Sequence, residues 1–150
     1  MHPQALYDEG TGVHTNALPL PDQSEVNIYE RLLGTTSFHD DSIAFVQHKE
    51  LAHQRQSITF GELKLQVQRL GQGLISKTDL QQGDVVMLLA PNSIDWIIVM
   101  LAAQFAGLRV ALASPAYSAK ELHHVYQLAQ PRKIFLTSSL LDSAFKVEIS

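Results

Sequence analysis

The pair of glycines in Gly71-Gln72-Gly73 has the spacing that most invites a nucleotide-binding interpretation. A dinucleotide fingerprint needs a third glycine three residues later, where this chain has Ser76. The pair also lies inside a helical pattern and not at a strand-to-helix turn, so close helix packing is the preferred explanation. A glycine-rich loop ending in Gly-Lys-Ser or Gly-Lys-Thr occurs nowhere in these 150 residues, which argues against a P-loop nucleotidase.

Histidine and cysteine give no sign of a metal site. No two histidines have a His-x-x-x-His spacing, and adjacent His123 and His124 diverge by about 100° on a predicted helix. The chain has no cysteine, which excludes disulfides, thiolate ligands and a cysteine nucleophile. We therefore expect surface positions for all seven histidines, which are His2, His14, His39, His48, His53, His123 and His124.

Other reactive residue types have simpler structural explanations. Asp40-Asp41 could be paired acids, but beside a strand start they favour a solvated turn. The serines lack a Gly-x-Ser-x-Gly context, so a hydrolase nucleophile is not supported. Trp96 lies among apolar residues of a predicted helix, which favours core packing, with stacking on a ligand as the alternative.

The composition limits the class of protein. Hydrophobic residues make up 45% of the chain and charged residues 17%. This apolar content is enough to form a core and is higher than that of generally disordered chains. The net charge of -4, without a Lys/Arg cluster, predicts no nucleic-acid partner. Residues 96–113 are apolar except for Gln104 and Arg109. Because Gly107 interrupts them and their period changes, they predict a helix, a turn and a strand, with no transmembrane segment.

Residues 1–23 predict a flexible, extended N-terminal arm, because they hold prolines and glycines without an apolar period. They also lack the basic start and apolar run of a secretory signal. A short helix is expected from Ser24 to about residue 33, ended by Gly34. Its predicted apolar side comprises Val26, Tyr29, Leu32 and Leu33.

Two capping boxes mark the starts of longer helices. Thr59 with Glu62 precedes an apolar stripe of Leu63, Val67, Leu70 and Leu74. Ser118 with Glu121 precedes a second stripe of Leu122, Val125, Tyr126 and Leu128. Each box predicts a helix that packs one face against a core.

Strands and helices alternate through the rest of the chain. Strands are predicted at 43–48, 57–60, 84–90, 109–113 and 133–136, and helices at 94–105 and from Ser138 or Ser139 through Leu141 and Phe145. Short loops between alternating elements imply right-handed crossovers and a parallel sheet. The predicted fold class is therefore α/β, a βαβαβ parallel sheet preceded by a short two-strand element and the arm.

Several motifs in this order resemble the adenylate-forming, AMP-dependent ligase superfamily, which includes acyl-CoA synthetases and 4-coumarate-CoA ligase-like enzymes. The matching segments are Ile58-Thr59-Phe60-Gly61-Glu62-Leu63, Gln82-Gly83-Asp84-Val85-Val86, Pro91-Asn92-Ser93, Leu101-Ala102-Ala103-Gln104-Phe105-Ala106-Gly107, Ser114-Pro115-Ala116-Tyr117-Ser118 and Glu121-Leu122. Ser114 replaces the family's common Asn. Each motif is weak alone, but about 80 residues in register are specific.

The resemblance implies a two-step ligase, in which ATP activates a carboxylic acid as an acyl-adenylate and coenzyme A then takes the acyl group. The family's Ser/Thr/Gly-rich phosphate loop, its adenine and ribose motifs and its catalytic lysine do not occur in these residues. Residues 24–150 therefore predict an incomplete N-terminal part of the ligase domain, inactive alone. No catalytic residue and no metal site is assigned. ATP, Mg and coenzyme A are expected only in the complete family member, and no cofactor for this chain alone.

One binding loop follows from the resemblance. In acetyl-CoA synthetase-like members the loop after the second parallel strand lies beside the coenzyme A nucleotide, and the match here is Ser114, Pro115, Ala116 and Tyr117. The carboxyl end of a parallel strand is also where open α/β sheets place ligands. The alternative is a plain strand-to-helix turn in which Ser118 caps the next helix.

Two further hypotheses remain open beside a ligase fragment. A free-standing α/β unit could be a non-enzymatic protein-binding module derived from such a ligase. Flavodoxin-like nucleotide binding is weaker, because the glycine pattern is missing. An open edge of the sheet predicts self-association. The resemblance implies an intracellular protein, cytoplasmic or peroxisomal, and leaves the acyl substrate undetermined.

Overall fold

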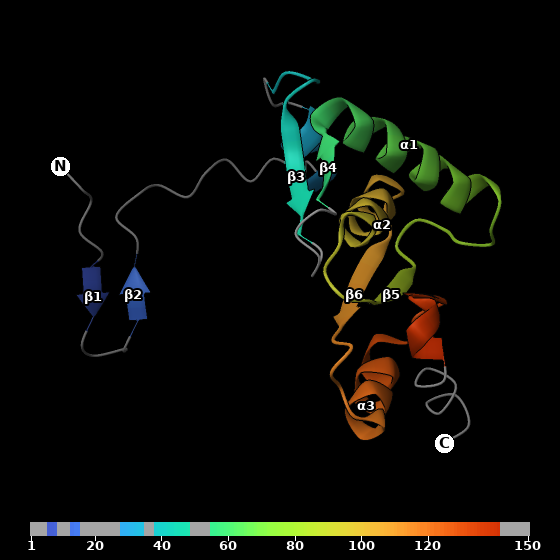
Figure 1. Cartoon of the computed structure of the whole chain (residues 1–150). Coiled ribbons are helices and arrows are strands. Elements are labelled where there is room, and N and C mark those ends of the chain that lie inside the picture. Colours follow the sequence, from blue (N-terminus) through green and yellow to red (C-terminus); the bar gives the residue numbers. More distant parts are fainter. Residues whose placement is uncertain (1–5, 9–12, 16–27, 35–37, 49–54, 142–150) are drawn as a thin grey trace.

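The computed structural model describes residues 6–8, 13–15, 28–34, 38–48 and 55–141 (Figure 1). Most of the predicted arm, residues 1–23, lies outside these ranges. Within it, β1 (Leu6–Asp8) and β2 (Val13–Thr15) form an antiparallel pair that the sequence did not predict. The flexibility of the arm stays a prediction.

The predicted first helix is only partly described. Ser24 and Val26 lie outside the described residues, and the chain forms a single π-helical turn, η1 (Glu30–Gly34). Tyr29 and Leu33 are buried as expected. Leu32 is 49% exposed, so its predicted place on the apolar side was wrong, because Tyr29 and Leu33, four positions apart, are the residues directed toward the core.

The α/β part follows the predicted order of elements. It contains β3 (Ile43–Gln47), β4 (Gln56–Thr59), α1 (Phe60–Ser76), β5 (Val85–Leu89), α2 (Ile94–Phe105), β6 (Arg109–Ala113), α3 (Ala119–Ala129), β7 (Lys133–Leu136) and the 3-10 turn η2 (Ser138–Leu140). β3 and β4 form the predicted two-strand element and pair antiparallel. Of the predicted last helix, only η2 and Leu141 are described, and Phe145 lies outside the described residues. The N-cap of η2 is Thr137, whereas Ser138 or Ser139 was predicted.

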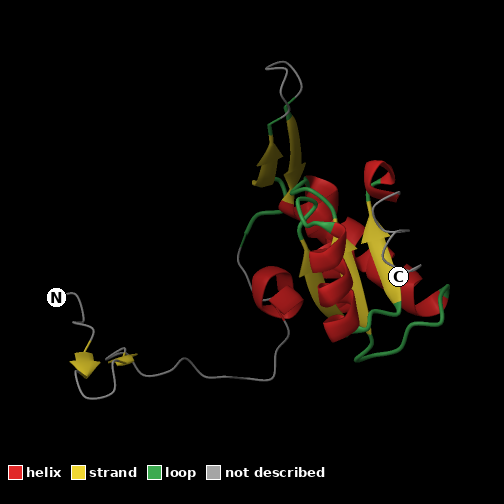
Figure 2. Cartoon of the chain, turned by 90° about the horizontal axis from the view of Figure 1, so that it is seen from below, coloured by secondary structure: helices red, strands yellow, loops and turns green. Residues whose placement is uncertain are grey.

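Three parallel strands form the main sheet in the order β6-β5-β7. The chain moves from β5 to one edge and then back across β5 to the other edge. Right-handed crossovers in opposite directions place their helices on opposite faces of the sheet. Figure 1 shows α1 and α2 above the strands and α3 below them, and Figure 2 shows helices on both sides of the sheet.

The central strand β5 is buried on both faces. Val86 packs on one face with Leu74 of α1 and Leu80, whereas Met87 and Leu89 pack on the other face with Leu122 of α3. Alternate residues of a strand point to opposite faces, so an uninterrupted apolar run is what a doubly covered strand requires. The predicted apolar strand is confirmed.

Close packing between α1 and α2 depends on Gly71. A Cβ atom at this position would lie 2.9 Å from the carbonyl oxygen of Ala102 and would overlap the ring of Phe105. The helix-packing interpretation is therefore confirmed for Gly71. Gly73 faces open space, so it has no such role.

Charged side chains tie the amino ends of β5 and β7 to the loop after α1. Arg132 Nη2 lies 3.1 Å from Asp79 Oδ2, and Lys133 Nζ lies 2.8 Å from Asp79 Oδ1. Arg132 Nε also lies 3.5 Å from Asp84 Oδ2. The hydrogen bond and charge of Lys133 are the main reasons why the pKa of the Asp79 carboxyl is lowered.

Candidate functional site

The loop after β6 contains the four residues predicted to face a coenzyme. The Ser114 hydroxyl accepts a hydrogen bond from the Ala116 amide at 3.2 Å, and the Ser114 carbonyl accepts one from the Tyr117 amide at 3.1 Å. These bonds close a tight turn in which Pro115, Ala116 and Tyr117 are exposed and Ser114 is half-buried. The turn places Tyr117, 42% exposed, directly before α3.

The predicted capping box fixes the start of α3. The Ser118 hydroxyl accepts from the Glu121 amide at 3.4 Å, and the Glu121 carboxylate accepts from the Ser118 amide at 2.8 Å. Glu121 Oε2 also accepts from the Ser118 hydroxyl at 2.7 Å. These hydrogen bonds lower the pKa of the Glu121 carboxyl. The turn and the Ser118 cap of the alternative interpretation are both present, and the coenzyme-side role of the loop stays a prediction.

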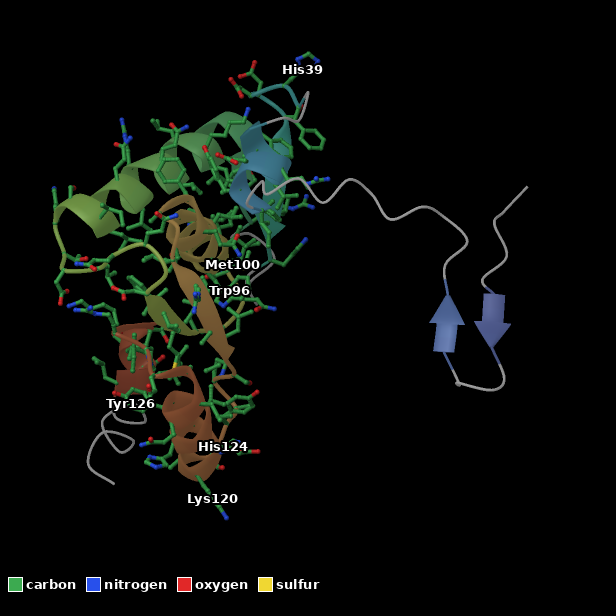
Figure 3. The ribbon with its side chains drawn as sticks, turned by 180° about the vertical axis from the view of Figure 1, so that it is seen from behind. His39, Trp96, Met100, Lys120, His124 and Tyr126 are labelled. Carbon is green, nitrogen blue, oxygen red and sulfur yellow. The ribbon has the colours of Figure 1, made fainter. Side chains whose placement is uncertain are left out.

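A hollow of about 670 Å³ opens beside this turn. It is lined by Tyr117, Ser118, Lys120, Glu121, His124 and Val125. Figure 3 shows Lys120 and His124 on the same side of α3. The hollow therefore brings a phenol ring, an ammonium group and an imidazole together with the Glu121 carboxylate.

Only one of the four predicted residues contributes to this hollow. Tyr117 lines it, whereas Ser114, Pro115 and Ala116 form the turn that holds Tyr117 in place. Sequence reasoning missed Lys120 and His124. A signal was present for these two, because positions 120 and 124 have the four-residue spacing of one helix side.

A second hollow lies where β5 gives way to α2. The Ser93 hydroxyl caps α2 by accepting from the Trp96 amide at 3.0 Å. Gln47 of β3 reaches the same helix end, where its Oε1 accepts from the Ile94 amide at 3.1 Å. The groove between them measures about 400 Å³ and is lined by Phe45, Val46, Gln47, His48, Asn92, Ser93, Ile94, Trp96 and Ile97.

The prediction that Trp96 packs in the core was wrong. The described residues form three apolar core clusters, and Trp96 belongs to none of them. It lines the groove and is only half-buried (Figure 3). Neighbouring Ile97, Ile98 and Met100 do pack in the cluster between α1 and α2. The helix was therefore predicted correctly, and only the position of the Trp96 side chain was wrong.

The described residues contain no cluster of metal-ligating side chains. Among them, no three or more His, Asp or Glu side chains gather closely enough to hold a metal ion. Asp40 and Asp41 lie in a turn, where Asp40 forms an ion pair of 3.1 Å with Lys64. Across the same residues, none of the helices has the length and apolar character needed to cross a membrane.

Comparison with known proteins gives the family. The family model described as AMP-binding enzyme matches residues 35–149. The 4-coumarate-CoA ligase 1 of Narcissus pseudonarcissus is 37% identical over 83 residues, which are 55% of this chain and 15% of that protein. The mitochondrial medium-chain acyl-CoA ligase of Rattus norvegicus is 32% identical over 98 residues, or 65% of this chain and 15% of that protein.

Solved structures share the fold over much of this chain. An acyl-CoA synthetase of Brucella canis matches 82% of this chain with a TM-score of 0.74 at 16% identity, and the match covers 22% of that protein. The luciferase-like enzyme of Zophobas morio matches 61% of this chain with a TM-score of 0.58 at 28% identity, covering 21% of that protein. The chain thus spans less than a quarter of each of these relatives and matches an N-terminal segment, and through residues 35–149 it belongs to the AMP-binding enzyme family.

Proposed function

We propose that this chain supplies the N-terminal α/β part of an ATP-dependent acyl-CoA ligase-like enzyme. In such an enzyme the carboxylate attacks the α-phosphorus of ATP, which gives an acyl-adenylate and releases pyrophosphate. A thiol of coenzyme A then attacks the acyl carbon and AMP leaves. The observation that carries the proposal is the match over residues 35–149 to a family whose relatives here are 4-coumarate and acyl-CoA ligases.

The chain alone is proposed to be inactive. Transfer at the α-phosphorus needs donors and cations aimed at the charge that develops on the phosphate. Neither a phosphate loop in the sequence nor a group of metal-ligating side chains in the described residues offers this arrangement. The contribution of this segment is therefore structural, with one loop near the coenzyme.

The test of the proposed function is a chimera. Residues 35–149 replace the matching segment of the Narcissus ligase, and carboxylate-dependent ATP–pyrophosphate exchange is measured with a panel of acids. We expect exchange from the chimera and none from this chain alone. A soluble, folded chimera without exchange would contradict the proposal, and exchange by this chain alone would show that the missing motifs are not needed.

The coenzyme-side role of Ser114–Tyr117 is a second proposal on the same chimera. Tyr117→Ala and Lys120→Glu remove the ring and the ammonium group of the hollow. We expect the KM for coenzyme A to rise several-fold while the KM for ATP stays unchanged. Leu128→Ala is the matched control, because Leu128 lies on α3 outside the hollow and is 74% exposed.

Self-association through the edge of the sheet is proposed for the separate chain. β6 and β7 are the edge strands of the described sheet, and Leu112 of β6 is an apolar side chain that is 52% exposed. An unpaired edge with exposed apolar residues promotes pairing between chains. Light scattering is expected to show concentration-dependent association that Leu112→Lys reduces; a monomer at all concentrations would contradict this.

A further inference from the structure

The groove between β3 and α2 has an apolar wall on each side. Phe45 and Val46 of β3 form one wall, and Trp96 and Ile97 of α2 form the other. Phe45 and Val46 are each 39% exposed, and in their strand only Ala44 and Gln47 are partly buried. His48 adds a polar group to the lining. The groove is thus an exposed apolar surface with a polar border.

One direct hydrogen bond joins the two walls. Gln47 of β3 accepts from the Ile94 amide of α2 at 3.1 Å, so the strand is bonded to the amino end of the helix. On the helix side, the Ser93 hydroxyl holds the Trp96 amide at 3.0 Å. A two-stranded ribbon alone is only marginally stable, and this contact anchors its end. The groove is therefore a built feature of the fold.

The composition of α2 indicates that something covers this groove. Among its 12 residues only Asp95 and Gln104 are polar. A helix that is apolar on all sides is expected to be surrounded by other elements. α1 covers one side through Leu101, and the sheet covers another through Ala103. Trp96 itself belongs to no core cluster of the described residues, although Ile97 beside it packs against the cluster shared with α1.

We infer that this groove docks an apolar segment from the remainder of an acyl-CoA ligase domain, with Trp96 as the anchor that this segment buries. The inference rests on the proposed function. In the matching synthetase of Brucella canis the common segment is 22% of the chain, so most of the fold lies outside it. Tryptophan in a partly formed pocket is the residue type most often found at the energetic centre of an interface.

The size of the groove favours an inserted segment over a second copy of this chain. Stable dimers bury roughly 1,200–2,000 Å² over broad, complementary faces. A groove of about 400 Å³ accepts a few side chains. Such a volume fits one short apolar stretch of a longer polypeptide.

The single tryptophan makes the test specific, because one 5-fluorotryptophan label reports on the groove alone. The labelled chain is mixed with the Narcissus ligase from which the matching segment has been deleted. We expect a one-to-one complex and a shifted 19F resonance of residue 96. Phe45→Asp should weaken the complex at least tenfold, whereas Leu128→Asp, at an exposed site on α3, should leave the affinity unchanged.

A second measurement covers the case in which the deleted ligase does not fold. Hydrogen exchange of residues 43–48 and 92–97 is compared between the separate chain and the chimera that carries residues 35–149. We expect slower exchange of both stretches in the chimera. Equal exchange in a chimera that unfolds cooperatively would overturn the inference, and so would a complex that forms with the 19F resonance unmoved.

The outcomes separate this inference from the proposed function. An active chimera whose groove exchanges as in the separate chain keeps the ligase assignment and removes the groove proposal. A complex that Phe45→Asp weakens, together with an inactive chimera, keeps the groove proposal and rejects the proposed ligase function. A dimer of this chain that Phe45→Asp abolishes would identify a second copy as the occupant and overturn the one proposed.

Discussion

The parallel strands all begin at one border of the sheet, here called the amino edge, and all end at the opposite border, the carboxyl edge. The chain closes the amino edge with its own contacts and leaves the carboxyl edge open. At the amino edge, Arg132 and Lys133 form ion pairs with Asp79 and Asp84, and the Gly83 amide donates to the Gly107 carbonyl at 2.8 Å. At the carboxyl edge, the loops after β5 and β6 border two open hollows. Ligands bind at the carboxyl edge of open α/β sheets, so the edge that this chain leaves open is the one at which we propose the coenzyme-side loop.

The largest expected effect concerns the core beneath the amino edge. Leu80 is 3% exposed and packs with Leu74, Val86 and Leu108. Leu80→Ala should lower the free energy of unfolding by about 2–5 kcal/mol, because it removes buried methyl groups and leaves a cavity. Urea unfolding measures this. Leu128→Ala, at 74% exposure, is the control and should change it by less than about 0.5 kcal/mol; equal effects would contradict the placement of the core.

The second effect tests the tight turns of the amino edge. Gly107 has a φ of +72°, and a Cβ there would lie 2.8 Å from Gln82 Cγ. Gly83 has a φ of +88° and open space around it. Gly83→Ala should cost about 1–2 kcal/mol from backbone strain alone. Gly107→Ala should cost more, because the Gln82 side chain must also move. In a Gln82→Ala background, Gly107→Ala and Gly83→Ala should lower the free energy of unfolding by similar amounts. If Gly107→Ala still costs more, the Gln82 side chain is not the cause of the difference.

The sequence predicted the elements well because their ends carry local signals. Thr59 and Ser118 cap α1 and α3 through hydrogen bonds to residues three positions later, and the structure contains both boxes. α2 has its predicted bounds because Ser93 caps it and Gly107, with positive φ, ends the turn that follows. Such signals act within a few residues and are therefore visible in one sequence.

The orientation of side chains was predicted less well, because it depends on distant partners. Leu128 was assigned to the buried face of α3, but Leu122, Val125, Tyr126 and Ala129 occupy that face and Leu128 is 74% exposed. α2 has no polar face to show which side meets the sheet, so Trp96 was placed in the core. The order β6-β5-β7 is likewise a long-range property that periodicity does not reveal.

The third effect compares capping at the two ends of the fold. Thr59→Ala and Ser118→Ala each remove one hydroxyl that accepts from an amide, at 3.2 Å and 3.4 Å. Each should cost about 1 kcal/mol of unfolding free energy. Ser118→Asp keeps an accepting oxygen and should recover most of that loss. If Ser118→Ala costs nothing while Thr59→Ala does, the start of α3 is not held by its own cap and the carboxyl edge is looser than described.

The smallest expected effect is the acid response of the amino edge. The pKa of the Asp79 carboxyl is lowered below its ordinary value of 3.8, mainly by Lys133, so the folded state favours the ionised form. That contribution is fully present above pH 3.8 and is lost as the pH falls through the lower folded-state pKa. Asp79→Asn removes it, so the melting temperatures of the variant and the parent chain should converge as the pH is lowered below 3.8.

Glu121 supplies the matched group at the carboxyl edge, because Ser118 lowers its pKa in the same direction without a cation. Added salt screens ion pairs between exposed groups and acts less on a local hydrogen bond to a neighbouring residue. At neutral pH, salt should therefore narrow the difference in melting temperature between Asp79→Asn and the parent chain. The difference in melting temperature between Glu121→Gln and the parent chain should stay nearly unchanged. The same response to salt at both positions would show that charge pairing does not distinguish the two edges, and the contrast would then rest on packing and turn geometry alone.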